Sequence, residues 1–244
     1  MSGAGLLIAH LMFVFLIFVD PPVGVWRHRN LRRSSLRDSE ARVRFYRWSI
    51  LIQLLWVFGI GSIIFLCSVS PEALGVDWKV IPSAGLYALV VGLLIALFVP
   101  FAFLAEMGRK SGEPDFQSLL EQILEPISAQ LPQTFTERRL FAALIVVASS
   151  CEEILFRGFL IYYVSESSEG LLNLPVWGTI VASAFVFGMA HLYQGMKGVL
   201  STSLAGTLLA TAYVLSGSLL VPIILHTLAN LRILAFYRPS GSNM

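Results

Sequence analysis

The chain has 244 residues, of which 56% are hydrophobic and only 13% are charged. Ordinary soluble domains carry about 25% charged residues, so the composition excludes a soluble globular domain. The net charge is +2, and the basic residues follow loop positions, so no nucleic-acid partner is predicted. The two cysteines, Cys67 and Cys151, lie in apolar segments and are predicted to be buried side chains that form neither a disulfide nor a metal site.

The hydrophobic residues form seven blocks instead of a helical or strand alternation. Such blocks predict an all-α protein, a polytopic membrane helix bundle of about seven transmembrane helices. The first block stops at Asp20-Pro21-Pro22, because proline ends a helix. The predicted segments are Ala4–Val19, Trp48–Val69, Ala84–Ala105, Leu140–Val164, Pro175–Tyr193, Val199–Leu215 and Leu219–Phe236.

Eight arginines lie between the first two segments, in Arg27–Arg47. By the positive-inside rule this loop is cytoplasmic and rests on the headgroups of the lipid bilayer. With seven spans, the N-terminus is then outside and the C-terminus cytoplasmic. This topology leaves Lys79 as the one basic residue of the external loops, which is the asymmetry that the rule requires.

The connection after the third segment contains two helix signals. Phe116–Leu124 has the apolar spacing of an amphipathic helix that lies flat on the cytoplasmic face. Thr134 followed by Glu137 is typical of a capping box, and it predicts the start of the fourth membrane helix. In the sixth segment Gly206 and Ala210 are four residues apart, a spacing that lets membrane helices approach closely.

Polar and ionisable side chains occur inside three of the later segments. A charged side chain near the middle of a membrane helix costs about 2.5–3.5 kcal/mol, so these groups are predicted to face protein or a water-filled cavity. Because such groups pair with one another, we predict a shared pocket. The fourth segment contributes Glu152, Glu153 and Arg157, the fifth ends in His191, and the seventh carries His226 and Asn230.

These residue types suffice for hydrolysing an amide bond with an activated water. A carboxylate can act as general base towards the water, an imidazole can pass its proton to the leaving amine, and an Asn amide can donate to a developing oxyanion. Glu153 and Arg157 are four residues apart on one helix. A structural ion pair is their simplest role, with direct catalysis by Glu153 as the alternative.

Three motifs follow one another along these segments: Glu152-Glu153-x-x-x-Arg157, Phe187-x-x-x-His191 and His226-x-x-x-Asn230. In this order they resemble the motifs of the CAAX protease and bacteriocin-processing family (CPBP, or Abi) of intramembrane endopeptidases, which includes the type II CAAX prenyl endopeptidases. The resemblance covers residues 140–237. Each motif alone is weak, but three in order, each in its own apolar segment, make a specific match.

The resemblance implies a peptide hydrolase of the glutamate type, without a cofactor or metal. It implies that Glu152 is the water-activating base, assisted by His191, and that His226 and Asn230 stabilise the oxyanion. The implied substrate is a peptide or protein, with prenylated proteins as one option. The supporting residues of the site are Glu153, Arg157 and Phe187.

The resemblance also divides the chain. Residues 1–139 are expected to hold N-terminal membrane helices, the basic loop and the amphipathic connector, and residues 140–244 the catalytic bundle, within one integral membrane domain. The implied location is a bacterial cell (inner) membrane.

Other interpretations stay open on the residues alone. One Glu and two His also form a catalytic zinc ligand set, although the His-Glu-x-x-His spacing of zinc proteases is absent. A non-catalytic membrane scaffold or bacteriocin-immunity protein could use the same bundle to bind a peptide or a sensor partner. A proton-coupled transporter would also use buried ionisable groups, but the sequence has no paired broken helices or inverted repeat.

Overall fold

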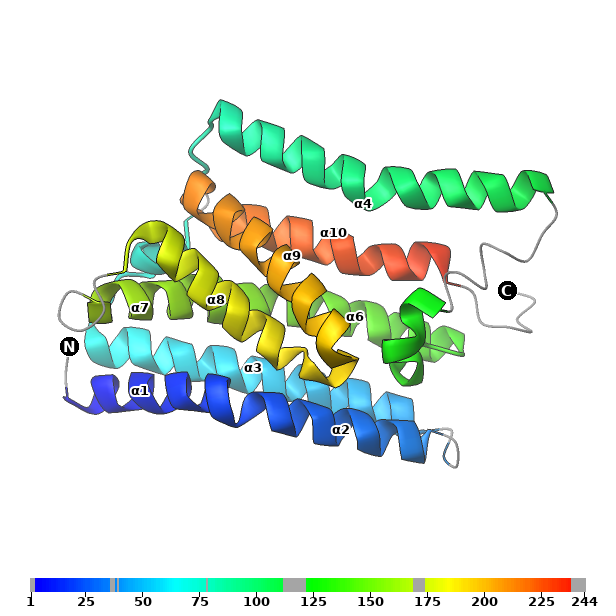
Figure 1. The fold of residues 1–244 in the computed structure, drawn as a ribbon. Coiled ribbons are helices and arrows are strands. Elements are labelled where there is room, and N and C mark those ends of the chain that lie inside the picture. The colour runs from blue at the N-terminus through cyan, green and yellow to red at the C-terminus, as the bar shows by residue number, and fades with distance from the viewer. Residues whose placement is uncertain are drawn as a thin grey trace.

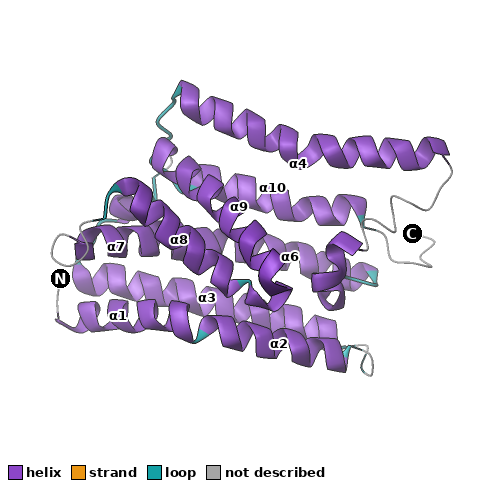
Figure 2. Ribbon diagram, viewed as in Figure 1, coloured by secondary structure: helices purple, strands orange, loops and turns teal. Residues whose placement is uncertain are grey.

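The computed structural model describes residues 3–35, 38, 40–77, 79–111, 122–168 and 174–237. Over these residues the secondary structure is helical, with no strand (Figure 2). The predicted all-α class is therefore confirmed. The helix Phe116–Leu124 that the apolar spacing predicts lies mostly outside the described residues.

The helices follow the predicted apolar segments in chain order. Short 3₁₀ turns lie at Pro71–Leu74, Glu125–Gln130 and Leu192–Gln194, and a π-helical turn lies at Ile154–Leu160. The α-helices are α1 (Gly3–Phe18), α2 (Asp20–Ser34), α3 (Ala41–Cys67), α4 (Ala84–Ser111), α6 (Phe135–Glu153), α7 (Ile161–Ser168), α8 (Val176–Ala190), α9 (Gly195–Ser216) and α10 (Leu220–Phe236).

Two helices of the described chain are long and apolar enough to cross a membrane on their own, Ala41–Cys67 and Leu192–Ser216. A third is added if α1 and α2 count as one bent span. Shorter apolar helices occupy Ala84–Pro100, Val176–Ala190 and Leu220–Phe236. The structure therefore supports a membrane protein, while the number of seven transmembrane helices stays a prediction.

The segment after the first apolar block differs from the expectation. It is helical from Asp20 to Ser34, as α2, and the chain bends by 50° between α1 and α2. Pro21 and Pro22 occupy the first turn of α2, where a helix does not use the backbone N–H that proline lacks. The prolines therefore bend the chain and begin a second helix, and the predicted basic loop is helical over residues 27–34 and 41–47.

The start of α6 agrees with the predicted capping box. The Thr134 hydroxyl accepts a hydrogen bond from the backbone N–H of Glu137 at 3.2 Å. The Glu137 carboxylate accepts from the backbone N–H of Gln133 at 2.6 Å, one residue before the position of the standard box. This cap fixes where α6 begins and so sets the register of its acidic residues.

The helices form one bundle with α6 in its interior (Figure 1). Helix α3 contacts α6 on one side and α10 contacts it on the other, while α4 lies outside α10. Helices α8 and α9 cross closely, because a Cβ atom at Gly188 would lie 1.9 Å from the Ser203 Oγ and one at Gly206 only 3.0 Å from the Phe187 ring. The close approach predicted for Gly206 is thus observed.

Candidate active site

The two adjacent glutamates stand at the junction between α6 and the π-helical turn Ile154–Leu160. A π turn shifts the backbone hydrogen-bond ladder, and such turns occur often at functional sites. One carbonyl in the turn has a partner from another helix, because the Ser183 hydroxyl on α8 donates to the Phe156 oxygen at 2.7 Å. The turn is therefore anchored to the helix that carries His191.

Glu153 and Arg157 form the ion pair that their spacing predicts. Arg157 Nη1 donates to Glu153 Oε1 at 2.9 Å, and both side chains have no exposed surface. The guanidinium also donates to the Gly206 carbonyl at 3.0 Å and lies 4.4 Å from the centre of the Phe187 ring. These contacts join α6, α8 and α9 through one buried cation.

His226 on α10 lies between the two glutamates. Its Nδ1 is 2.7 Å from Glu153 Oε1, and its Nε2 is 3.8 Å from Glu152 Oε2. Because the carboxylate oxygen accepts, Nδ1 carries the proton, so Nε2 is the nitrogen directed towards Glu152. Glu153 thus fixes the orientation of the imidazole.

The other two predicted site residues are also held by named contacts. His191 Nδ1, at the end of α8, donates to the Phe187 carbonyl at 2.8 Å, which leaves its Nε2 for other partners. Asn230 Nδ2 donates to the Ser149 hydroxyl at 3.3 Å, one turn before the glutamates on α6. The structure therefore brings all of the predicted residues into one place.

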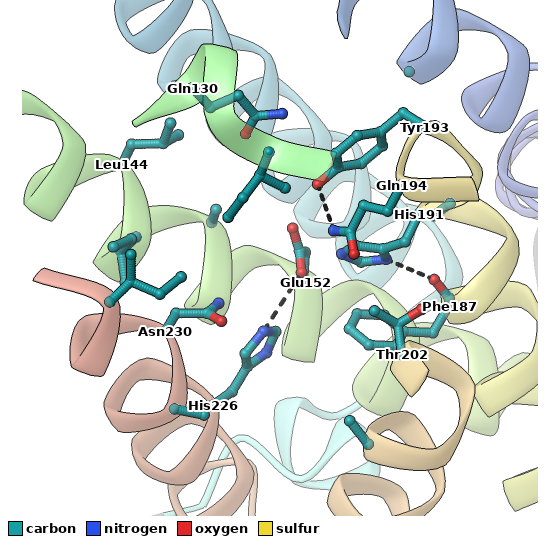
Figure 3. Close-up of a pocket in the computed structure, with 18 of the residues that line it drawn as sticks. Gln130, Leu144, Glu152, Phe187, His191, Tyr193, Gln194, Thr202, His226 and Asn230 are labelled. Atoms are coloured by element: carbon teal, nitrogen blue, oxygen red, sulfur yellow. Dashed lines mark hydrogen bonds and ion pairs between the residues drawn. The ribbon is translucent and has the colours of Figure 1, made fainter. Parts of the chain in front are cut away.

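These side chains meet at a cavity of about 660 Å³. Glu152, His191, His226 and Asn230 line it, together with the ring of Phe187 (Figure 3). Asn230 and His226 lie on one side of the Glu152 carboxylate, and His191 lies on the other (Figure 3). The buried pair Glu153–Arg157 is not part of the lining, so the two glutamates differ in environment: one faces the cavity and one stands behind its wall.

Several lining residues were not predicted from the sequence. Gln53 on α3 donates its amide N–H to Glu152 Oε1 at 3.4 Å, and Tyr193 and Gln194 follow His191 in the wall. Gln53 is a polar residue inside an apolar segment, and this feature of the sequence could have indicated that its side chain faces the cavity. The N-terminal half also contributes Asp20, Arg27 and Ser49 to the lining, so the cavity is built from both halves of the chain.

No group of three or more His, Cys, Asp or Glu side chains among the described residues is placed to hold a metal ion. The carboxylate and imidazole groups nearest one another are Glu152, Glu153 and His226, and Arg157 already neutralises one of these carboxylates. The donors that remain at the cavity suit the polarisation of a water by a carboxylate and an imidazole.

The fold and the cavity define a helical protein with membrane-spanning candidates and an internal cavity lined by carboxylate, imidazole and amide groups. Residues 135–232 match the family described as type II CAAX prenyl endopeptidase Rce1-like, and the matched part contains all three motifs. The match confirms the resemblance drawn from the three motifs and supports a peptidase over a scaffold. Comparisons with curated proteins and with solved structures gave no match.

Proposed function

We propose that this protein is an intramembrane endopeptidase in which Glu152 activates the hydrolytic water. The observation that carries the proposal is the division between the two glutamates. Glu153 is occupied by Arg157 and His226, whereas the Glu152 carboxylate faces the cavity between two imidazoles. A carboxylate in such a cavity can accept a proton from water and pass it on.

The proposed reaction uses the two sides of Glu152 for different steps. A water held by Glu152 and His191 loses a proton to Glu152 as its oxygen attacks the carbonyl carbon of the scissile peptide bond. The carbonyl oxygen becomes an oxyanion that accepts hydrogen bonds from the Asn230 amide and from the Nε2–H of His226 in its doubly protonated form, whose charge the neighbouring glutamates stabilise. The C–N bond then breaks, and the leaving amine takes the proton from Glu152, with His191 assisting the transfer.

The proposed substrate is a membrane-bound peptide or protein that reaches the cavity from the bilayer. By the family match, a C-terminal Cys-a-a-X sequence with a prenylated cysteine is the first candidate. Its cleavage after the cysteine would release the last three residues.

The test compares new protein termini in membranes of cells that make the wild type, Glu152→Gln or Glu72→Gln. Glu152→Gln keeps the shape of the side chain and loses the base, so termini made by the wild type are expected to be absent. Glu72 is exposed in a turn away from the cavity, and Glu72→Gln should give the wild-type pattern. The same termini in Glu152→Gln membranes would refute the glutamate mechanism.

The zinc alternative is tested on the purified enzyme with 1,10-phenanthroline. The proposed mechanism routes no step through a metal, so cleavage rates with and without the chelator are expected to agree. If the chelator inhibits cleavage and added Zn²⁺ restores it, the attacking water is bound to a metal and is not activated by the glutamate alone.

A further inference from the structure

The wall of the cavity on the His191 side contains a polar cluster outside the three motifs. Gln194 Nε2 donates to the Tyr193 hydroxyl at 3.1 Å, and Gln130 is a second polar neighbour of this hydroxyl. All three side chains line the same cavity as Glu152. Figure 3 shows the Tyr193 hydroxyl and the Glu152 carboxylate directed into the same part of the cavity.

The position of the Tyr193 ring is fixed by both halves of the chain. Its centre lies 5.8 Å from that of the His191 ring and 5.3 Å from that of the His28 ring on α2. His28 is itself held, because its Nδ1 lies 3.1 Å from the Gln130 side-chain nitrogen. The phenol thus has a defined orientation in the protein without any ligand.

Gln194 is equally well placed. Gly198 is needed for its position, since a Cβ atom there would lie 2.3 Å from the Gln194 Cβ. Because the amide nitrogen donates to Tyr193, the phenol oxygen is the acceptor, and its own O–H is left to donate. A hydroxyl that accepts one hydrogen bond becomes a better donor in the next.

We infer that Tyr193 is a further substrate-contacting residue, whose hydroxyl donates to a main-chain carbonyl of the bound peptide on the His191 side of Glu152. The inference rests on the proposed function. If the scissile carbonyl oxygen points to Asn230 and His226, the peptide presents neighbouring main-chain groups to the opposite wall. There Tyr193 supplies a fixed O–H donor and Gln194 orients it.

The test uses Tyr193→Phe, which keeps the ring and removes only the hydroxyl, with Tyr87→Phe as the matched control. Tyr87 is 62% exposed on the outer helix α4, away from the cavity. The probe is an S-farnesyl peptide ending in Cys-Val-Ile-Met. We expect Tyr193→Phe to lower kcat/KM by about tenfold, the loss of one hydrogen bond to substrate, and Tyr87→Phe to leave it unchanged.

A second measurement separates contact with substrate from a change in the fold. Peptides in which one main-chain amide at a time becomes an ester have a weaker carbonyl acceptor at one position. At one position the ester should weaken binding to Glu152→Gln protein, and this penalty should vanish when Tyr193→Phe is added. Equal penalties at every position, with and without the hydroxyl, would overturn the inference.

The two proposals fail in different ways. Unchanged protein termini in Glu152→Gln membranes would refute the proposed function, and the inference with it, whereas a wild type that neither binds nor cleaves the farnesyl peptide would refute the prenylated substrate. A wild type that cleaves it, with Glu152→Gln inactive and Tyr193→Phe unaltered, would refute the role of Tyr193 alone.

Discussion

At the scale of single residues, the buried pair Glu153–Arg157 connects stability to function. Arg157 has no exposed surface and donates to two acceptors on different helices. Removing one member of a buried ion pair leaves an uncompensated charge in a low-dielectric interior, which costs about 3–5 kcal/mol. Because the same carboxylate orients His226, loss of the pair also removes a catalytic candidate from its position.

We therefore predict that Arg157→Ala lowers the free energy of unfolding by about 3–5 kcal/mol. The measurement is a denaturant titration in detergent micelles. Arg32→Ala is the control, because Arg32 and Glu125 form an ion pair with exposed side chains, and such pairs contribute about 0–1 kcal/mol. Equal losses of unfolding free energy in the two variants would show that the buried ion pair contributes no more to stability than the exposed one.

The candidate site was predictable in part because ionisable residues in apolar segments have few alternatives to a shared pocket. The polar residues in apolar segments that predicted the shared pocket are Glu152, His191, His226 and Asn230. The spacing paired Glu153 with Arg157, but it did not show that this pair lies behind the cavity wall, because that position depends on the contacts of Arg157 with Gly206 and Phe187 on neighbouring helices. Tyr193 was missed because a tyrosine near a helix end is also common at a membrane interface.

At the scale of the helices, one feature of α6 is determined by local sequence and another depends on tertiary contacts. The cap at Thr134 is a local signal, and α6 begins where it predicts. The π turn Ile154–Leu160 has no such signal, since no residue type in Ile-Leu-Phe-Arg-Gly-Phe-Leu marks a π turn. It is anchored by Ser183 from another helix, a contact that no pattern within α6 reveals.

The crossing of α8 and α9 gives a prediction for this scale. In Gly188→Ala the added methyl would meet the Ser203 hydroxyl at 1.9 Å and the Val199 carbonyl at 2.8 Å, so backbone must move. We expect a loss of about 1–3 kcal/mol, typical of an overpacked core. Thermal unfolding in detergent measures it.

Gly92→Ala is the matched control for that substitution, because Gly92 also lies within a helix, and its Cβ would meet nothing within 4 Å. Its stability should equal that of the wild type or exceed it slightly, since Ala favours a helix over Gly. If both alanine variants unfold at the same temperature, the helix crossing tolerates a methyl group and the close approach is not required.

At the scale of the whole molecule, the fold class followed from composition, but the count of spans did not. Apolar blocks alone predict helices in lipid, and every predicted block contains helix. The first segment was predicted to stop at Asp20-Pro21-Pro22, and α1 does end at Phe18, but the chain continues after a 50° bend as a second helix, α2, which was not predicted. That bend places Asp20 and Arg27 at the cavity, so the N-terminal half is part of the site and more than an anchor.

The orientation of the bundle across the membrane can also be tested. Helix α1 begins at one end of it, and α10 ends at the other (Figure 1). Helix α2, with its arginines, ends where α10 ends, and α4 begins at the opposite end (Figure 1). By the positive-inside rule we expect the arginine-rich end to lie in the cytoplasm, with the start of the first helix outside.

The prediction is that Lys79→Cys reacts with a membrane-impermeant maleimide in intact cells, whereas Arg33→Cys reacts only after the membrane is opened. Both positions are exposed, Lys79 before α4 and Arg33 in the last turn of α2. A Cys67→Ala background removes the partly exposed native thiol, and Cys151 is buried. The reverse labelling pattern would invert the topology and would place the basic end outside, against the charge asymmetry on which the assignment depends.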